Sequence, residues 1–263
     1  MVPYLNAVFL LSSGPQHSCK LDSSRLNMPR KLIQLVTGLP PQVDGVGDYA
    51  LTLARALRDD QEVESLFVVA NPRWSGPNII EGFRVVMLPE RSKKGLHFAL
   101  DRITDESGAP RDTPLLLHCS LYGFATRALA LWLVAGVERW RRERPRSILI
   151  TMFHELDAWG SIWTSAFWLN PIHCWILRRL ARQSNVHFVS NARYARSLAQ
   201  IAGIREENIE RMPVLSTVGE PPRDWPQNLG SRDRQLVIFG RQASRDAIFF
   251  EQTSLLERTC KVL

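Results

Sequence analysis

The segment that decides the fold runs from Leu32 to Leu57 and reads LIQLVTGLPPQVDGVGDYALTLARAL. It opens with a short, mostly apolar run, which is typical of a buried parallel strand. A loop with two prolines and three glycines follows at 38–47. From Val46 onward, apolar residues recur at helical spacing. A strand, a glycine-containing turn and a helix in this order predict the start of a Rossmann-like domain.

The rest of the chain repeats this alternation. Short apolar runs predict further strands, and apolar residues at helical spacing predict the helices between them. The alternation predicts an α/β fold with a mainly parallel sheet and helices on both faces. Asn170 is expected to cap a helix that has Pro171 in its first turn, and Ser190 or Asn191 to cap a later helix that Gly203 ends. The expected strands lie at 66–70, 83–88, 115–119, 147–153 and 186–189, and the expected helices at 126–143, 171–182 and 191–201.

The domain organisation follows from changes in composition. Residues 1–29 are polar after an apolar start that no Lys or Arg precedes, so we expect a disordered extension and no signal peptide. Residues 30–215 are expected to form the Rossmann-like domain. A segment rich in proline and glycine at 216–233 predicts a linker. Residues 234–263 hold one expected strand and one expected helix, which is only the beginning of a second domain.

The bulk composition suits a soluble globular protein. Of the 263 residues, 45% are hydrophobic and 22% charged, with a formal net charge of +7. The basic bias favours anionic partners, or it reflects a cationic surface without a specific role. The four cysteines include no C-x-x-C pair, so a zinc ribbon is not expected, and buried thiols at Cys119 and Cys174 indicate a reducing, cytoplasmic location. The most apolar stretch, 158–177, is too polar to span a membrane.

The glycine loop is the first candidate for ligand binding. Backbone N–H groups of Gly45, Val46 and Gly47 at the start of a helix could hold a phosphate. The alternative is an ordinary turn that uses glycine for its conformation. The dinucleotide fingerprint is incomplete and no Walker A motif occurs, so NAD and other cofactors are not expected.

Other candidates follow the later strands, because ligands of open α/β sheets bind beyond the carboxyl ends of the strands. His154 and Glu155 come directly after an expected strand, and Ser190 follows the next. His154 could bind a sugar hydroxyl or act as a general acid or base, or it could simply order its own loop. The spacing of the histidines matches no standard metal site, so no metal is expected.

Six of the eight tryptophans lie between residues 132 and 175. Core packing explains most of them, but an aromatic acceptor platform is a second interpretation. Neighbouring arginines also allow peripheral contact with a membrane that contains anionic lipid. No nucleic-acid-binding motif accompanies the basic residues, so nucleic acid is not an expected partner.

Taken together, these motifs resemble the GT-B group of retaining glycosyltransferases, in particular family-four-like members. The resemblance covers roughly residues 30–250 and depends on the order of the motifs more than on any one of them. The motifs are PPQVDGVGDYA at 40–50, TMFHEL at 151–156, SAFWL at 165–169, VSN at 189–191 and LVIFGR at 236–241.

The resemblance implies a nucleotide-sugar donor and a carbohydrate or lipid-linked acceptor. Gly45 and Gly47 would lie near the donor phosphates, and His154 would contact the transferred sugar. Arg241 would neutralise the leaving diphosphate, with Arg245 in place of the lysine expected nearby. The paired glutamates that hold the donor in this group lie beyond residue 263, so we expect little or no transferase activity from this chain alone. The alternative is a non-catalytic module that binds a carbohydrate or lipid carrier. A hydrolase is not expected, because no G-x-S-x-G motif occurs.

Overall fold

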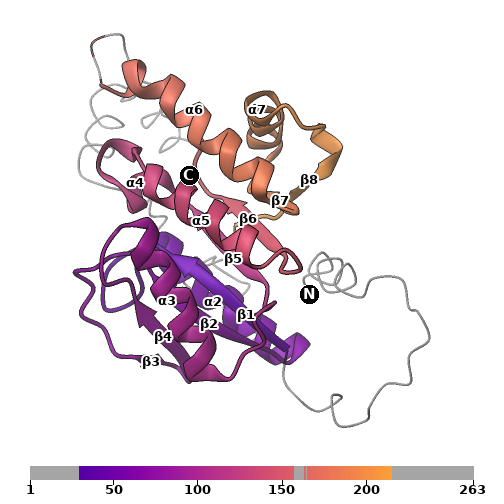
Figure 1. Ribbon diagram of the computed structural model, residues 1–263. Coiled ribbons are helices and arrows are strands. Elements are labelled where there is room, and N and C mark those ends of the chain that lie inside the picture. Colours follow the sequence, from indigo (N-terminus) through magenta and orange to yellow (C-terminus); the bar gives the residue numbers. More distant parts are fainter. Residues whose placement is uncertain (1–29, 157–162, 164, 215–263) are drawn as a thin grey trace, which may run out of the picture. The chain divides into compact units, whose positions relative to one another are not determined.

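The computed structural model describes residues 30–156, 163 and 165–214 (Figure 1). The chain divides into two compact units, Met1–Val218 and Gly219–Leu263, and the second unit lies outside the described residues. The predictions for 1–29, for the linker at 216–233 and for the start of a second domain at 234–263 therefore concern residues that are not described. The same holds for Arg241 and Arg245.

The first unit is built on an eight-stranded sheet in the order β3-β4-β2-β1-β5-β6-β7-β8. Every neighbouring pair is parallel except β3 and β4, which form an antiparallel hairpin at one edge. The prediction of a Rossmann-like, mainly parallel sheet is therefore confirmed. The strands are β1 (Arg30–Val36), β2 (Val63–Val69), β3 (Ile79–Ile80), β4 (Phe83–Met87), β5 (Leu115–Cys119), β6 (Leu149–Phe153), β7 (Val186–Val189) and β8 (Ile209–Arg211).

Helices cover both faces of this sheet, as the sequence predicts (Figure 1). One face packs against α2, and the other packs against α3, α5, α6 and α7. The helices are α2 (Gly45–Gln61), α3 (Lys93–Ser107), α4 (Leu121–Phe124), α5 (Leu131–Glu143), α6 (Ser165–Gln183) and α7 (Ala192–Ala202), with short 3₁₀ turns η2 (Thr126–Ala128) and η3 (Glu206–Asn208). None of the helices in the described part of the chain is both long and apolar enough to cross a membrane.

Successive residues of each strand point to opposite faces, so the sheet divides the core in two. On the side of α2, Leu32 and Leu116 pack with Leu53. On the other side, Ile33 and Leu117 belong to a larger apolar cluster contributed mainly by α3, α5, α6 and α7. The apolar core on the α2 side is interrupted by three buried polar residues in the middle of the sheet, Gln34, Ser65 and His118. They form part of the candidate site.

The strand order reverses direction between β1 and β5. From β1 the chain moves outward to β2 and β4, then returns across the sheet to β5 and continues to β8. In doubly wound folds this switch point creates the crevice in which ligands bind, outside the carboxyl ends of the strands. The end of β1, the start of α2 and the ends of β5 and β6 all lie at this edge.

The helix predicted at 126–143 begins later than expected. Arg127 and Ala128 have positive φ angles of 55° and 60°, so η2 is separated from α5, which starts at Leu131. The buried His173 on α6 donates from Nε2 to the Arg127 carbonyl over 2.8 Å. This contact with another helix accompanies a left-handed backbone conformation, which the local sequence alone does not favour.

The helix predicted at 171–182 begins earlier than expected, at Ser165, so Pro171 lies inside α6. Asn170 does not cap the helix. Its side-chain oxygen instead accepts a long contact of 3.7 Å from the Cys174 thiol, one turn later. Six residues of helix precede Pro171, so the proline lies in the helix interior, where it cannot donate to the preceding turn and its ring crowds the carbonyl four residues earlier.

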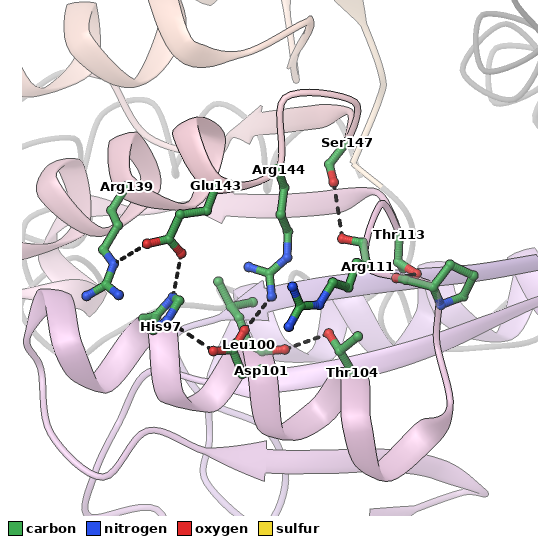
Figure 2. A network of polar contacts seen from close by, with 11 residues as sticks. His97, Leu100, Asp101, Thr104, Arg111, Thr113, Arg139, Glu143, Arg144 and Ser147 are labelled. Atoms are coloured by element: carbon green, nitrogen blue, oxygen red, sulfur yellow. Dashed lines mark hydrogen bonds and ion pairs between the residues drawn. The ribbon is translucent and has the colours of Figure 1, made fainter.

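The helix α3 was not among the predicted elements, although the sequence contains its signals. The Ser92 hydroxyl caps its start by accepting from the Gly95 N–H at 2.9 Å, and Gly108 ends it in the left-handed conformation. A polar network joins α3 to α5 (Figure 2). In it the Asp101 carboxylate pairs with Arg144, and His97 Nε2 lies 3.0 Å from the same carboxylate.

Candidate functional site

The N-terminus of α2 is capped by a carboxylate from the chain itself. Asp44 Oδ1 accepts hydrogen bonds from the N–H groups of Val46 (2.9 Å) and Gly47 (3.3 Å). Its other oxygen accepts from the Thr37 hydroxyl at 2.6 Å, directly after β1. The Asp44 side chain therefore joins the end of the first strand to the start of the first helix. It also occupies two of the N–H groups that the sequence assigns to a phosphate.

The two glycines of this turn have different surroundings. A Cβ on Gly47 would lie 2.2 Å from the Gly38 carbonyl oxygen, so the loop and helix pack too closely for any side chain there. A Cβ on Gly45 would have no neighbour within 4 Å. The Asp44 side chain does not bind the Gly45 N–H. Gly47 is thus explained by packing, whereas Gly45 lies at an open position.

His154 follows β6 at the same edge of the sheet. Its backbone N–H donates to the Cys119 carbonyl at 3.0 Å, which continues the parallel pairing of β5 and β6. Its Nε2 lies 3.1 Å from His118 Nδ1, and the two ring planes are inclined by only 18°. Burial lowers the pKa of His154 to about 4, against the opposing effect of the Asp44 charge. The imidazole is therefore neutral at physiological pH.

His118 lies in the middle of the sheet and is fully buried. Its Nε2 is 2.8 Å from the Gln34 side-chain oxygen, and the Gln34 amide nitrogen donates to the Ser65 hydroxyl at 2.8 Å. Burial lowers the pKa of His118 well below its ordinary value, and the neighbouring His154 acts in the same direction. A continuous chain of polar contacts therefore crosses β2, β1 and β5 and ends at His154.

Tyr49 on α2 packs over this pair of histidines. Its ring meets His154 edge-on at a centroid distance of 5.0 Å and His118 at 6.0 Å. Its hydroxyl donates to the Met212 sulfur at 3.0 Å. Burial raises the pKa of Tyr49 to about 12, so the phenol stays protonated. The aromatic wall on one side restricts the orientations that the two imidazoles can take.

Glu155 and Ser190 lie at the same edge of the sheet. The Ser120 hydroxyl donates to the Glu155 carboxylate at 3.0 Å, which connects the ends of β5 and β6. Phe153 pairs with Val189, so Ser190 occupies the position beside His154 on the next strand. The Ser190 hydroxyl accepts from the Asn191 amide at 3.1 Å. The structure thus brings Gly45, His154, Glu155 and Ser190 to one edge.

A cation that the sequence analysis did not single out lies at this edge as well. The Arg91 guanidinium donates to the carbonyls of Ala70 (3.1 Å) and Gly123 (2.9 Å), which follow β2 and β5. Partial burial, with a smaller contribution from Arg73, lowers the pKa of Arg91. The Arg91 guanidinium nevertheless keeps its charge at physiological pH. No sequence motif marks Arg91, because its role depends on the ends of two other strands.

The contact between polar residues inside the strands was not predicted, although its signal is visible in the sequence. Gln34 and His118 interrupt runs of apolar residues that otherwise read as fully buried strands. A polar residue in such a run needs a buried hydrogen-bond partner. That requirement predicts a contact between buried polar groups, but the partner cannot be chosen without the strand order.

Two surface cavities lie away from these residues. One, of about 430 Å³, is lined by Glu206, Glu207 and Glu210 among others, which disfavours an anionic ligand. The other, of about 330 Å³, lies at Arg111 and Arg144. Across residues 30–156, 163 and 165–214 there is no group of three or more His, Cys, Asp or Glu side chains that could hold a metal ion.

No protein-family model matches the chain, and no curated protein matches it by sequence. Among solved structures, one similar chain is an alpha-glucosyltransferase in complex with UDP and a 13-mer DNA containing a HMU base. The two chains are 15% identical, with a TM-score of 0.36. The alignment covers 61% of this chain and 35% of the other, so it spans about a third of that enzyme's length.

Proposed function

We propose that this chain is part of a nucleotide-sugar-dependent glycosyltransferase of the GT-B type, and that His154 contacts the transferred sugar. The observation that supports it most is a neutral, partly buried imidazole at the carboxyl edge of the sheet beside the switch point. A neutral imidazole can exchange hydrogen bonds with sugar hydroxyls without adding charge to the site. The order of the sequence motifs supports the same assignment.

The donor phosphates would lie near the start of α2, but with a changed set of contacts. Asp44 already binds the N–H groups of Val46 and Gly47, and a phosphate there would face its negative charge. The open position at Gly45 and the cation of Arg91 are the better candidates within the described residues. We propose Glu155 and Ser190 as contacts to sugar hydroxyls, and Arg241 and Arg245 as contacts to the diphosphate.

A binding experiment on the purified chain tests this function without requiring turnover. We expect one or more of UDP-glucose, UDP-N-acetylglucosamine and GDP-mannose to bind in a calorimetric titration, and a His154→Gln variant to bind at least several-fold more weakly. His97→Gln, on the other face of the sheet, is the matched control and should bind as the unaltered chain does. Equal binding by the His154 variant would refute the assigned contact, and no binding to any donor would refute the function.

A second reading is a module that binds a carbohydrate or a lipid carrier without catalysis. The observation that favours it is the exposure of tryptophans near and on α6, where Trp163 is 89%, Trp168 72% and Trp175 47% exposed. Core packing therefore does not account for these three, whereas Trp140 is buried. Large exposed apolar side chains often mark an interaction surface.

Vesicle sedimentation tests this second reading. If the surface contacts a membrane, the chain should sediment with phosphatidylglycerol-containing vesicles, and a Trp168→Ser, Trp175→Ser double variant should remain in solution. Phe98→Ser removes an exposed aromatic residue of α3 and serves as the control. Sedimentation that is unchanged in the double variant would argue against a role for α6.

A further inference from the structure

We propose that Ser65, Gln34 and His118 are positioning residues that hold His154 with its proton on Nε2, so that Nδ1 accepts a hydrogen bond from a sugar hydroxyl. The inference rests on the proposed function for its substrate, but the proton positions follow from the contacts inside the sheet. It assigns a direction to the chain of hydrogen bonds described above.

The direction begins at Ser65 and Gln34. In the structure the Gln34 amide nitrogen donates to the Ser65 hydroxyl at 2.8 Å, and the amide oxygen faces His118. An amide oxygen can only accept. His118 Nε2, 2.8 Å away, must therefore carry a proton and donate it.

His118 then determines the state of His154. Complete burial keeps His118 neutral, so with its proton on Nε2 its Nδ1 has only a lone pair. His154 Nε2, 3.1 Å from that lone pair, must be the donor. Because His154 is also neutral, its Nδ1 is left without a proton, and Nδ1 makes no hydrogen bond with a described residue.

The consequence for substrate is specific. A nitrogen with a lone pair accepts from a hydroxyl and cannot give a proton to a leaving group. His154 therefore recognises a hydroxyl hydrogen on the sugar and does not act as a general acid. Tyr49 supports this orientation, because its edge-on contacts with both rings hinder rotation of either imidazole.

Nuclear magnetic resonance on the ¹⁵N-labelled full chain tests the proton positions directly. Two-bond ¹⁵N–¹H spectra at pH 7 distinguish protonated from unprotonated ring nitrogens, and the His154→Gln spectrum assigns the His154 signals. We expect His154 with a protonated Nε2 and an unprotonated Nδ1. A proton on Nδ1, or on both nitrogens, would overturn the proposal.

Two matched variants test the role of the chain of contacts. Gln34→Met removes the acceptor for His118 at similar side-chain volume, and we expect a measurable Nδ1–H population on His154. Thr151→Val removes another buried polar side chain, bonded to Ser184, that does not touch the histidines, and should leave the His154 spectrum unchanged. If Gln34→Met does not fold, Ser65→Ala frees the Gln34 amide to rotate and should give the same population. An unchanged His154 spectrum in the folded variant would show that the substituted residue, Gln34 or Ser65, does not determine the proton position on His154.

Addition of UDP-glucose, UDP-N-acetylglucosamine and GDP-mannose separates this inference from the proposed function. The spectra of the substrate-free protein test the proton positions without any ligand. If a donor binds, we expect the Nδ1 signal to shift while that nitrogen remains unprotonated. If no donor binds, the proposed function fails and the sugar-hydroxyl contact fails with it. If a donor binds and Nδ1 is protonated, the proposed function stands, and the proposed direction of the hydrogen bonds from Ser65 to His154 fails.

Discussion

A Cβ atom on Gly47 would lie 2.2 Å from the carbonyl oxygen of Gly38, so the turn after β1 and the first turn of α2 are in contact through their backbones. This distance is shorter than any real contact of a Cβ with oxygen. Gly38 itself follows β1 by two residues. The close approach fixes where the start of α2 lies relative to the carboxyl edge of the sheet.

The two glycines of the turn should therefore respond differently to alanine. Gly47→Ala should lower the free energy of unfolding by about 2 kcal/mol or more, because the backbone must move to admit the methyl group. Gly45→Ala places its methyl group in open space and should be neutral or stabilising by up to about 1 kcal/mol. Urea unfolding of both variants measures the difference, and equal effects would contradict the packing argument.

The Asp44 carboxylate should matter both for helix stability and for His154. Asp44→Ala removes the cap of α2 and should cost about 1 kcal/mol, whereas Asp44→Asn keeps a capping oxygen and should cost less. Both variants remove a negative charge that raises the pKa of His154, so that pKa should fall further below about 4. Chemical denaturation gives the stabilities, and histidine resonances followed against pH give the pKa.

The same carboxylate should weaken the binding of a diphosphate. If donor phosphates approach the start of α2, loss of the Asp44 charge should strengthen UDP binding several-fold at low salt, and less at high salt. Ser92→Ala removes an equivalent cap from α3 and should leave UDP binding unchanged. Weaker UDP binding in Asp44→Asn would show that the carboxylate assists the ligand instead.

Acid should destabilise the fold through the two histidines. The folded-state pKa of His154 is about 4 against an ordinary value of 6.5, so the unfolded chain binds more protons between these values. The stability is fully present above about pH 6.5 and is lost as the pH falls toward 4. A shift of this size corresponds to at most about 3 kcal/mol for His154, and His118 acts in the same direction.

Urea unfolding between pH 7.5 and 4.5 measures that loss. His154→Gln removes one of the two titrating groups, so its stability should fall less steeply with acid than that of the unaltered chain. Thr151→Val changes no titrating group and should keep the original slope. A slope that is the same in all three proteins would show that His154 does not titrate with unfolding.

The sequence predicts an element correctly where its apolar pattern and helix-capping residues alone determine the backbone conformation. The strand at 115–119 and the start of α2 lie where the apolar pattern places them, and the caps at Asn191 and Gly203 follow ordinary helix-end rules. Predictions failed where a distant residue decides the backbone. The separation of η2 from α5 accompanies the contact of His173 with the Arg127 carbonyl, 46 residues apart in the sequence.

The candidate site was predictable only in part for the same reason. His154 follows a strand, and position after a strand can be read from the sequence. The relation of His154 to His118 and Gln34 depends on β1 and β5 being neighbours at the switch point, and many strand orders fit the same pattern of elements. The sequence therefore identifies His154 at the carboxyl edge of the sheet, but not its contacts with the buried residues that determine its protonation.

The α3 helix, which the sequence analysis missed, provides a final test through its contact with α5 (Figure 2). The Arg144 side chain is 9% exposed and pairs with Asp101, whose side chain is 41% exposed. Asp101→Ala leaves a largely buried guanidinium without its partner and should cost about 1 to 2 kcal/mol, reduced by solvent at Asp101. Asp105→Ala, an exposed change near the end of the same helix, should stay within about 0.5 kcal/mol of the unaltered chain.

A double-mutant cycle separates the ion pair from other effects of these changes. If the pair holds α3 against α5, Asp101→Ala should cost much less in a chain that already carries Arg144→Met, because the buried charge is then gone. Urea unfolding of the two single variants and the double variant gives the coupling. Additive effects would mean that the Asp101 carboxylate acts chiefly through His97, which lies 3.0 Å from it on the preceding turn of α3.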